Sequence, residues 1–230
     1  VDMIQGGADN DTMTFSRTVA TSSIYGGKGA DSIRFSGDVD SIKVGASAGD
    51  DVIDFDGKVL DSQITLDAED DTISFAAKVS NSLIYGGKGE DTFLASSIVE
   101  NSKFYGDNGD DTINLAASAV LRDSTFHGGA GEDSIGIASG ATGASSIYGG
   151  KGDDTILLTS TAALFLSGDK DDDAIDVAGT SLGATVNGGD GADSITNTGN
   201  GKTTFTGAAG KDTIKGGTGA NLIYGGQDAD

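Results

Sequence analysis

Residues 82–95 read SLIYGGKGEDTFLA, and residues 22–35 read SSIYGGKGADSIRF. In both stretches an apolar strand-like segment precedes and follows a glycine-rich turn that ends in aspartate. A repeat of this length predicts a solenoid, in which each unit forms one coil and stacks on the next. The aspartate recurs along the chain at intervals of 19 to 22 residues, at Asp11, Asp31, Asp51, Asp71, Asp91, Asp111, Asp133, Asp154, Asp173, Asp193 and Asp212.

Apolar residues keep step with this aspartate and predict the strands. Residues two and four positions after it are mostly apolar, as in Ile33 and Phe35, and this alternation is typical of a strand with one buried face. A second apolar column lies seven residues before each aspartate, and a column of valines from Val19 to Val99 lies between the two strands. We therefore expect an all-β fold, a parallel β-solenoid (β-roll or β-helix) of about 11–12 coils with repeats of about 20 residues.

Composition restricts the partners of the chain. There are 36 acidic residues against 14 Lys and Arg, a formal net charge of −22, and 38 glycines. This charge disfavours binding to nucleic acid and to anionic membranes, and no membrane insertion is expected. So acidic a chain with few bulky apolar residues tends to be disordered unless its carboxylates are neutralised, for which a divalent cation is the obvious candidate. Cysteine is absent, which excludes disulfides and zinc–thiolate sites.

The glycine-rich turn is suited to calcium. Its best copies read Gly-Gly-x-Gly-x-Asp and cover residues 26–31, 86–91, 128–133, 149–154 and 188–193. Calcium takes six to eight oxygen ligands, and main-chain carbonyls serve beside carboxylates. Glycines allow a positive φ and so turn carbonyls toward one point. Because stacking brings equivalent turns within about 4.8 Å of each other, an ion between two turns can collect oxygens from both.

The unit Gly-Gly-x-Gly-x-Asp followed by x-apolar-x resembles the nonapeptide of the RTX (hemolysin-type calcium-binding) repeat family. The resemblance implies one row of calcium ions over residues 1–206, with one glycine-rich turn per coil. Over residues 207–230, where nonapeptides follow one another directly and continue the same solenoid, it implies two rows. It also implies that the ligands are the motif aspartates and the carbonyls of the turns: Asp11, Gly26, Gly27, Gly29, Asp31, Gly49, Asp51, Gly86, Gly87, Gly89, Asp91, Gly106, Gly109, Asp111, Gly128, Gly129, Gly131, Asp133, Gly149, Gly150, Gly152, Asp154, Asp173, Gly188, Gly189, Gly191, Asp193, Gly207, Gly210, Asp212, Gly225 and Asp230.

Some turns depart from the motif. Residues 66–71 contain no glycine and residues 168–173 contain only one, so we expect distorted or empty calcium positions at both. Asn221 stands where the motif has aspartate, and the loss of one charge weakens that site. Four further acidic residues directly precede a column aspartate and are either ligands or part of a solvated surface: Asp50, Asp70, Asp110 and Asp153.

Three other features have a structural and a functional interpretation. His127 is the only histidine and stands in a column with Tyr85, Tyr105 and Tyr148, which predicts an outward-facing aromatic ladder. A sugar-binding platform is the alternative. Serines that enter the second strand, from Ser22 onward, predict a hydrogen-bonding corner ladder and not a nucleophile. A carboxylate repeated in every coil does not mark one active site, so we expect no enzyme activity in this chain.

The resemblance also suggests a function. RTX relatives are exported by type I secretion, and a self-repelling chain would stay unfolded in calcium-poor cytosol and fold on calcium outside the cell. We expect a calcium-binding structural segment of an exported, surface-layer-like (S-layer) protein. The alternatives are an adhesin, a glycan- or ice-binding module, or the calcium module of a secreted enzyme or toxin. The chain begins at Val1 and ends within a motif, so we interpret it as part of a longer protein whose open ends pair with its own continuation or with copies of itself.

Overall fold

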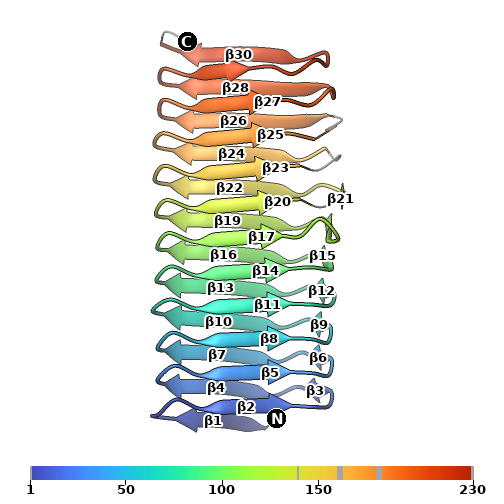
Figure 1. Ribbon diagram of the computed structural model, residues 1–230, viewed down its shortest axis with the longest axis vertical. Coiled ribbons are helices and arrows are strands. Elements are labelled where there is room, and N and C mark those ends of the chain that lie inside the picture. The colour runs from blue at the N-terminus through green and yellow to red at the C-terminus, as the bar shows by residue number, and fades with distance from the viewer. Residues whose placement is uncertain (1, 139, 160–162, 180–182, 229–230) are drawn as a thin grey trace.

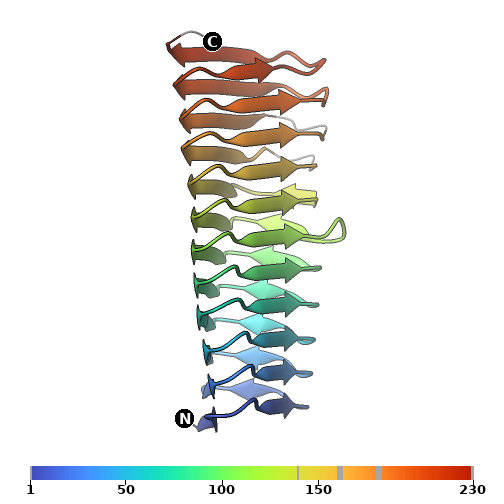
Figure 2. The ribbon, with the colours of Figure 1, turned by 60° about the vertical axis from the view of Figure 1, so that its left-hand side comes forward.

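The computed structural model describes residues 2–138, 140–159, 163–179 and 183–228. The molecule is a rod of stacked coils in which the strands of successive coils pair in parallel (Figure 1). Figure 2 shows that the coils keep a similar outline from one end of the rod to the other. This confirms the predicted all-β parallel solenoid, with about 11 turns and repeats of about 20 residues. No helix in the described residues is long and apolar enough to cross a membrane.

The described strands form three sheets that run along the rod. A twelve-stranded sheet comprises β1 (Met3–Gly7), β4 (Ser23–Lys28), β7 (Lys43–Ala48), β10 (Gln63–Ala68), β13 (Leu83–Lys88), β16 (Lys103–Asn108), β19 (Thr125–Ala130), β22 (Ser146–Lys151), β24 (Phe165–Lys170), β26 (Ala184–Asp190), β28 (Thr203–Ala209) and β30 (Leu222–Gln227). An eleven-stranded sheet comprises β2 (Thr12–Phe15), β5 (Ser32–Phe35), β8 (Val52–Phe55), β11 (Thr72–Phe75), β14 (Thr92–Ala95), β17 (Thr112–Leu115), β20 (Ser134–Ile137), β23 (Thr155–Leu158), β25 (Ala174–Val177), β27 (Ser194–Asn197) and β29 (Thr213–Lys215). A seven-stranded sheet of short strands comprises β3 (Val19–Ala20), β6 (Val39–Asp40), β9 (Val59–Leu60), β12 (Val79–Ser80), β15 (Ile98–Glu100), β18 (Val120–Arg122) and β21 (Gly140–Thr142).

The repeat fixes the register of these sheets. Each residue pairs with its equivalent one coil further on, as Ile24 does with Val44 and Ile33 with Ile53. A shift of one residue would turn every inward side chain to the outside, so the buried columns hold the register. The predicted apolar columns all lie inside the rod, and the valines of the third column are fully buried from Val39 to Val79.

Aromatic rings stack along the interior of the eleven-stranded sheet. The rings of Phe35 and Phe55 have centroids 4.8 Å apart and those of Phe55 and Phe75 5.3 Å apart, with planes within 7° of parallel. The stack then ends on Phe104, which meets Phe75 edge-on at 5.7 Å. The distance between neighbouring strands is close to the distance between the centroids of stacked rings. One phenylalanine per coil can therefore stack on the phenylalanine of the next coil.

The corner between the seven-stranded and twelve-stranded sheets is closed by a serine ladder. Ser82 Oγ accepts a hydrogen bond from the N–H of Ser62 at 3.1 Å and donates one to the carbonyl of Ser80 at 2.9 Å. The same N–H to hydroxyl bond recurs up to Ser145. This confirms the predicted corner ladder. The residue before the serine turns the chain with a left-handed φ of 45–56°, at Thr21, Ser41, Asp61, Asn81, Asn101 and Asp123.

The C-terminal part continues the same rod. Strands β28 and β30 extend the twelve-stranded sheet, and β29 extends the eleven-stranded sheet. In the described residues the seven-stranded sheet ends at β21, and the strands described beyond it belong to the other two sheets. The division into residues 1–206 and 207–230 by number of calcium rows stays a prediction.

Replacing Phe55 by alanine tests the stacked core. Phe55 is 1% exposed between Phe35 and Phe75, so Phe55→Ala should lower the free energy of unfolding by roughly 3–5 kcal/mol. Val52→Thr changes the same strand at a residue that is 41% exposed and should change it by less than about 0.5 kcal/mol. Urea unfolding in saturating calcium measures both, and equal effects would contradict the stacking.

Candidate metal centre

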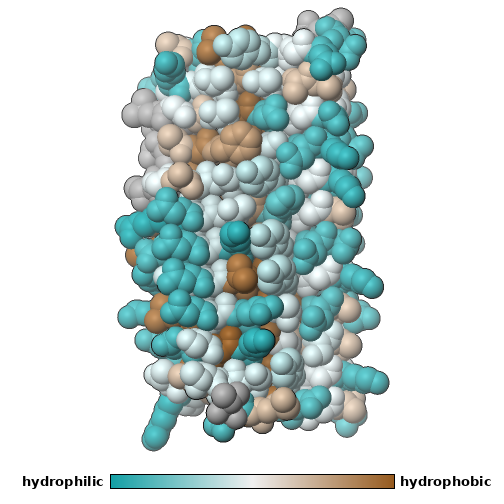
Figure 3. Space-filling model, turned by 180° about the vertical axis from the view of Figure 1, so that it is seen from behind, coloured by the Kyte–Doolittle hydropathy of each residue, from teal (hydrophilic) through white to brown (hydrophobic). Residues whose placement is uncertain are grey.

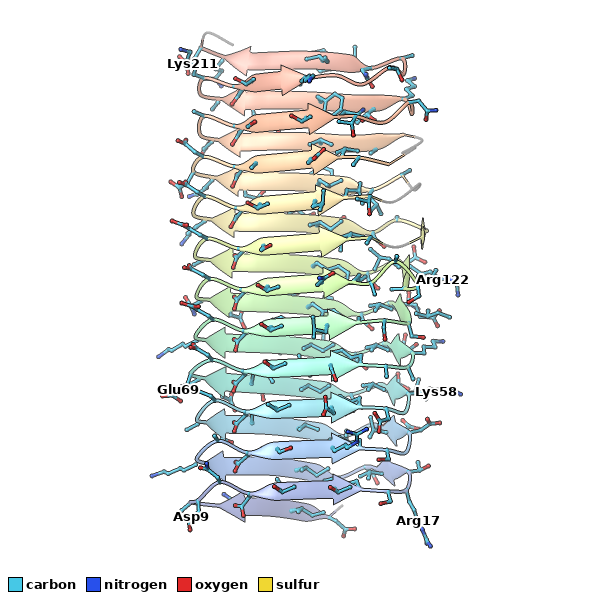
Figure 4. The ribbon with its side chains drawn as sticks, viewed as in Figure 1. Asp9, Arg17, Lys58, Glu69, Arg122 and Lys211 are labelled. Atoms are coloured by element: carbon cyan, nitrogen blue, oxygen red, sulfur yellow. The ribbon has the colours of Figure 1, made fainter. Side chains whose placement is uncertain are left out.

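The turns that precede the column aspartates lie on one edge of the rod, where the chain passes from the twelve-stranded to the eleven-stranded sheet. Figure 4 shows residues of three such turns, Asp9, Glu69 and Lys211, along this edge. We call it the glycine-rich edge. The six residues of each turn are numbered here as positions 1 to 6, so that Gly26 is position 1 and Asp31 is position 6.

Positions 2 and 4 of the turns have a left-handed backbone. In the turn at residues 26–31 they are Gly27 and Gly29, with φ of 124° and 105°. The turn at residues 66–71 keeps the same path without glycine, because Asp67 and Glu69 take φ of 81° and 70°. Residues 168–173 do likewise. The turns at residues 66–71 and 168–173 thus follow the same backbone path as the turns with the full motif. The expectation that their calcium positions are distorted or empty therefore depends on their side chains and not on their backbone. It stays a prediction.

The position 6 aspartates form a hydrogen-bonded column. Asp51 Oδ1 accepts a hydrogen bond from the N–H of Asp31 at 2.6 Å, and Asp71 Oδ1 accepts one from the N–H of Asp51 at 2.7 Å. Each carboxylate is thereby held against the coil before it. The same bond, at 2.7–3.0 Å, is accepted by Asp31, Asp91, Asp111, Asp133, Asp154, Asp173, Asp193 and Asp212.

The second oxygen of these carboxylates has no protein partner. Asp91, for example, is fully buried, and its Oδ2 accepts no hydrogen bond. Burying a charged oxygen without a partner costs several kcal/mol, so a repeated arrangement of this kind calls for a compensating charge. The oxygens in this state are Oδ2 of Asp31, Asp51, Asp71, Asp91, Asp111, Asp133, Asp154, Asp173 and Asp193.

The position 1 glycine allows this oxygen and a carbonyl of the next coil to lie close together. A Cβ atom built on Gly26 would lie 2.6 Å from the carbonyl oxygen of Ala46 and nearer still to Oδ2 of Asp31. One built on Gly6 would lie 2.6 Å from Oδ2 of Asp11. These contacts are too short for a real Cβ, so a side chain at position 1 would have to displace the oxygens. The same pair of oxygens lies beside Gly86, Gly106, Gly128, Gly149, Gly168, Gly188 and Gly207.

This donor set fits calcium. In the described part of the chain, no three His, Cys, Asp or Glu side chains come together to hold a metal. A cation at the glycine-rich edge would therefore be bound by a carboxylate from one turn and by main-chain carbonyls of the adjacent turns. Calcium accepts such an irregular all-oxygen site, whereas zinc favours nitrogen and sulfur ligands and magnesium requires a near-ideal octahedron.

Burial raises the pKa values of eight of the column aspartates. Desolvation is the largest cause, and neighbouring carboxylates add to it, while the hydrogen bond from the preceding backbone N–H lowers the pKa. A column without a cation therefore holds protons near neutral pH that calcium would displace. The pKa is about 6 for Asp51, Asp91, Asp133 and Asp193, about 7 for Asp154, and about 8 for Asp71, Asp111 and Asp173.

Position 5 carries a second polar column on the outside of the turns. Asp70 Oδ1 accepts a hydrogen bond from the N–H of Glu90, and Asp110 Oδ1 accepts one from that of Glu132, both at 2.8 Å. These bonds run to the following coil, whereas those of the position 6 column run to the preceding coil. The side chains are exposed, which favours the solvated-surface interpretation; a ligand role is untested for Asp50, Asp70, Asp110 and Asp153.

The aromatic column lies on the outer face of the twelve-stranded sheet, as predicted. His127 stacks between Tyr105 and Tyr148, with ring centroids 6.1 and 5.2 Å apart, and Tyr85 stacks on Tyr105 at 5.2 Å. The planes lie within 26° of parallel, so the inner rings cover one another's faces. Figure 3 shows this side of the rod as mostly hydrophilic or neutral, with separate hydrophobic patches.

The turn at residues 216–221 differs from those of the glycine-rich edge. Neither Gly217 nor Gly219 has a positive φ. The side-chain amide of Asn221 donates a hydrogen bond to the carbonyl of Gly217 at 3.1 Å, and its Oδ1 is buried without a hydrogen-bond partner. A cation there would find a neutral amide oxygen in place of a carboxylate, so the second calcium row stays a prediction.

The structure brings the predicted ligand residues together along one edge, except for Asp230, which lies outside the described residues. Gly225 contributes the carbonyl that faces Gly207 from the next coil. Sequence reasoning missed Gly6 and Gly168, whose turns lack one or more of the motif's three glycines. The signal that identifies them is a glycine five residues before the column aspartate, which is present in every described turn of this edge except those at residues 46–51 and 66–71.

Comparison with known proteins agrees with this geometry. The model of the family described as RTX calcium-binding nonapeptide repeat (4 copies) matches residues 1–16, 22–42, 78–97, 100–117, 137–159 and 197–230, which is more than half of the chain. No curated protein and no solved structure matches the chain.

The raised pKa values predict how the calcium-free fold responds to pH. An aspartate in an unfolded chain has a pKa near 3.9, whereas the pKa of the eight column aspartates named above is about 6 to 8 in the folded chain. Between these pKa values the folded chain binds more protons than the unfolded chain. The free energy of unfolding of the calcium-free chain therefore falls as pH rises from about 4 to 8. Thermal melting of calcium-stripped protein, followed by circular dichroism, should give a higher midpoint at pH 5 than at pH 8.

Two isosteric variants separate this effect from the general relief of acidic repulsion. Asp111→Asn should reduce the difference in midpoint between pH 5 and pH 8, because its carboxyl is buried in the column. Asp40→Asn removes an exposed carboxylate away from the turns and should leave the difference close to that of the unmodified chain. A midpoint that rises with pH in the absence of calcium would overturn the assignment.

Proposed function

This chain belongs to the RTX calcium-binding nonapeptide repeat family, and from that premise we propose that it is a structural segment of an exported cell-surface protein, of surface-layer type, that folds on binding calcium. Repeats of this family are calcium-binding and typically structural, and they occur in secreted bacterial proteins. The absence of enzyme activity, the surface-layer role and export by type I secretion are parts of the proposal.

One observation carries it: in most of the described coils, a buried carboxylate oxygen without a hydrogen-bond partner lies close to a carbonyl of the next coil. In the turn at residues 86–91, Oδ2 of Asp91 and the carbonyl of Gly106 both lie next to the point where a Cβ of Gly86 would be. The repetition of this pair along the rod supports a line of calcium sites, each of which would join two coils.

The magnitudes support coupling of folding to calcium. Extracellular modules bind calcium with a Kd of roughly 10⁻⁴–10⁻³ M, so calcium at about 1 mM adds roughly 0.4–1.4 kcal/mol per site to the stability of the folded state. Nine position 1 glycines lie beside both a column carboxylate oxygen and a carbonyl of the next coil. One calcium ion at each of these nine turns would add roughly 4–13 kcal/mol in total. A domain's whole stability is about 5–15 kcal/mol, so calcium at the concentration outside cells decides whether the rod forms.

The geometry does not favour the glycan-binding alternative. A sugar stacks on the open face of an aromatic ring, but the faces of Tyr105 and His127 are covered by neighbouring rings of the same column. The column therefore serves the packing of the outer face. Pairing of the rod's ends with the rest of its own chain or with copies of itself remains part of the proposal.

Calcium titration of the stripped chain tests the proposal. Far-ultraviolet circular dichroism should change from a largely unfolded spectrum to a β spectrum as calcium rises to millimolar concentration at pH 7.5, and the melting midpoint should rise with it. Magnesium at the same concentration should have a much smaller effect, because it binds reluctantly to irregular all-oxygen sites.

A matched pair of variants assigns the effect to the glycine-rich edge. Asp111→Asn and Asp133→Asn together remove two column carboxylates and should raise the calcium concentration needed for folding. Asp40→Asn with Asp61→Asn removes two exposed carboxylates from the opposite corner and should leave this calcium concentration nearly unchanged. A chain that shows the same β spectrum and melting midpoint with and without calcium would refute the proposed function.

A further inference from the structure

Side chains at positions 2 and 4 of the turns are directed at the preceding coil. A Cβ atom built on Gly87, at position 2, would meet the carbonyl oxygen of Asp67 one coil earlier. At position 4, a Cβ built on Gly131 would meet the carbonyl oxygen of Gly109. A residue other than glycine at either position therefore brings its side chain into the interval between its own turn and the turn before it.

Most of the side chains found at these positions are acidic. After the first turn, eight described residues at positions 2 and 4 are not glycine, and all eight keep a left-handed backbone with φ of 70–95°. Asparagine tolerates this conformation and has the shape of aspartate, but it stands at none of these positions. A negative charge is what six of the eight share: Asp67, Glu69, Asp107, Asp169, Asp171 and Asp228.

The acidic side chains at position 4 contact the preceding turn. Glu69 Oε2 accepts a hydrogen bond from the N–H of Gly49 at 3.0 Å, and Asp171 Oδ2 accepts one from that of Gly152 at 3.1 Å. In turns with the full motif, such as the one that contains Gly89, the same N–H donates to a main-chain carbonyl of the next coil. A carboxylate thus takes the place of a neutral acceptor between the two turns.

These added carboxylates lie near the buried column aspartate of the preceding turn. Desolvation is the largest cause of the raised pKa of Asp51, and the charge of Glu69 adds to it. The pKa of Asp154 is likewise raised mainly by desolvation, with a contribution from the charge of Asp169. Oδ2 of Asp51 and of Asp154 is buried without a hydrogen-bond partner. The interval after each of these aspartates therefore contains more negative charge than the motif alone supplies.

We propose that the acidic residues at positions 2 and 4 raise the calcium affinity of the intervals that they face. The two strongest sites then lie between the turns at residues 46–51 and 66–71 and between those at 149–154 and 168–173. This inference rests on the proposed calcium-binding function and assigns the order in which its sites fill. The interval that Asp107 faces has one added carboxylate and ranks between these two sites and those of the full motif.

The added residues act through their charge. In the described part of the chain no three carboxylates come together to hold one metal, so the column carboxylate and the main-chain carbonyls remain the ligands. A calcium ion is attracted by every negative charge within a few ångströms of it, and the number of charges around an oxygen site tunes its affinity for calcium. Two further carboxylates in one interval therefore strengthen binding there.

The inference reverses the expectation drawn from the number of glycines. That expectation makes the turns at residues 66–71 and 168–173 the weakest of the row, whereas their charge makes them the strongest. The backbone gives no reason for weakness, because Asp67 and Asp169 both take φ of 81°. The hydrogen bonds of the aspartate column also run through both turns.

Crystals of the calcium-saturated chain, transferred to solutions with decreasing calcium chloride, give the test, because anomalous scattering reports the occupancy of each calcium position. We expect the peaks at the two strongest intervals to be the last to disappear. Peaks that fade together along the edge, or first at these two intervals, would overturn the inference and leave the proposed function intact. No peak along the edge at saturating calcium would refute both.

Variants of one turn provide a second readout, which is the rise in melting midpoint from low to saturating calcium chloride at pH 7.5. Asp67→Gly with Glu69→Gly restores two motif glycines but removes two charges, so the rise should be smaller than in the unmodified chain. Asp67→Asn with Glu69→Gln keeps the side chains and should reduce it equally.

The control for net charge is Asp40→Asn with Asp61→Asn, which removes two exposed carboxylates from the opposite corner. This variant should keep the rise of the unmodified chain. A rise that stays the same or becomes larger in the variant with restored glycines would contradict the inference.

Discussion

The structure depends on a column of carboxylate oxygens that the fold buries without giving them a partner. One oxygen of each column aspartate accepts a hydrogen bond from the preceding coil, and this bond fixes the side chain inside the turn. The other oxygen then faces a carbonyl of the following coil, and two negative oxygens attract each other only through a cation. Backbone hydrogen bonds between parallel strands hold successive coils together. The negative charge of the unpartnered column oxygens at the glycine-rich edge calls for a cation or a proton from solution.

The other parts of each coil need no cation to compensate them. The serine ladder satisfies its own donors and acceptors from coil to coil, and the stacked phenylalanines fill the interior at the spacing of the strands. The two edges of the rod therefore differ. The corner with the serine ladder is held by neutral hydrogen bonds, whereas the glycine-rich edge buries carboxylate oxygens that have no hydrogen-bond partner. Under the proposed function calcium compensates this charge, and the stability of the fold then depends on the calcium concentration around it.

Much of this could be predicted from the sequence, because stacking converts a column of residues into a column in space. The periodicity of Asp31 and its equivalents indicated the coils, and the buried faces followed from alternation around residues such as Ile33. What the sequence pattern could not indicate was the direction of each Cβ within the turn. Counting glycines treats the three glycine positions of the motif alike, whereas glycine allows a positive φ at positions 2 and 4 and the close approach of the next coil at position 1. For this reason Gly168 was undervalued, and Asp67 and Glu69 were not expected to keep the regular backbone.

The most direct measurement is carbon-13 nuclear magnetic resonance of the aspartate side-chain carboxyls at pH 7, recorded over the range of calcium chloride concentrations in which the chain is folded. The account predicts that the carboxyl signals of column aspartates such as Asp111 and Asp133 shift as calcium binds, while those of exposed corner residues such as Asp40 and Asp61 do not. Column signals that stay unchanged in a folded, calcium-saturated sample would contradict it.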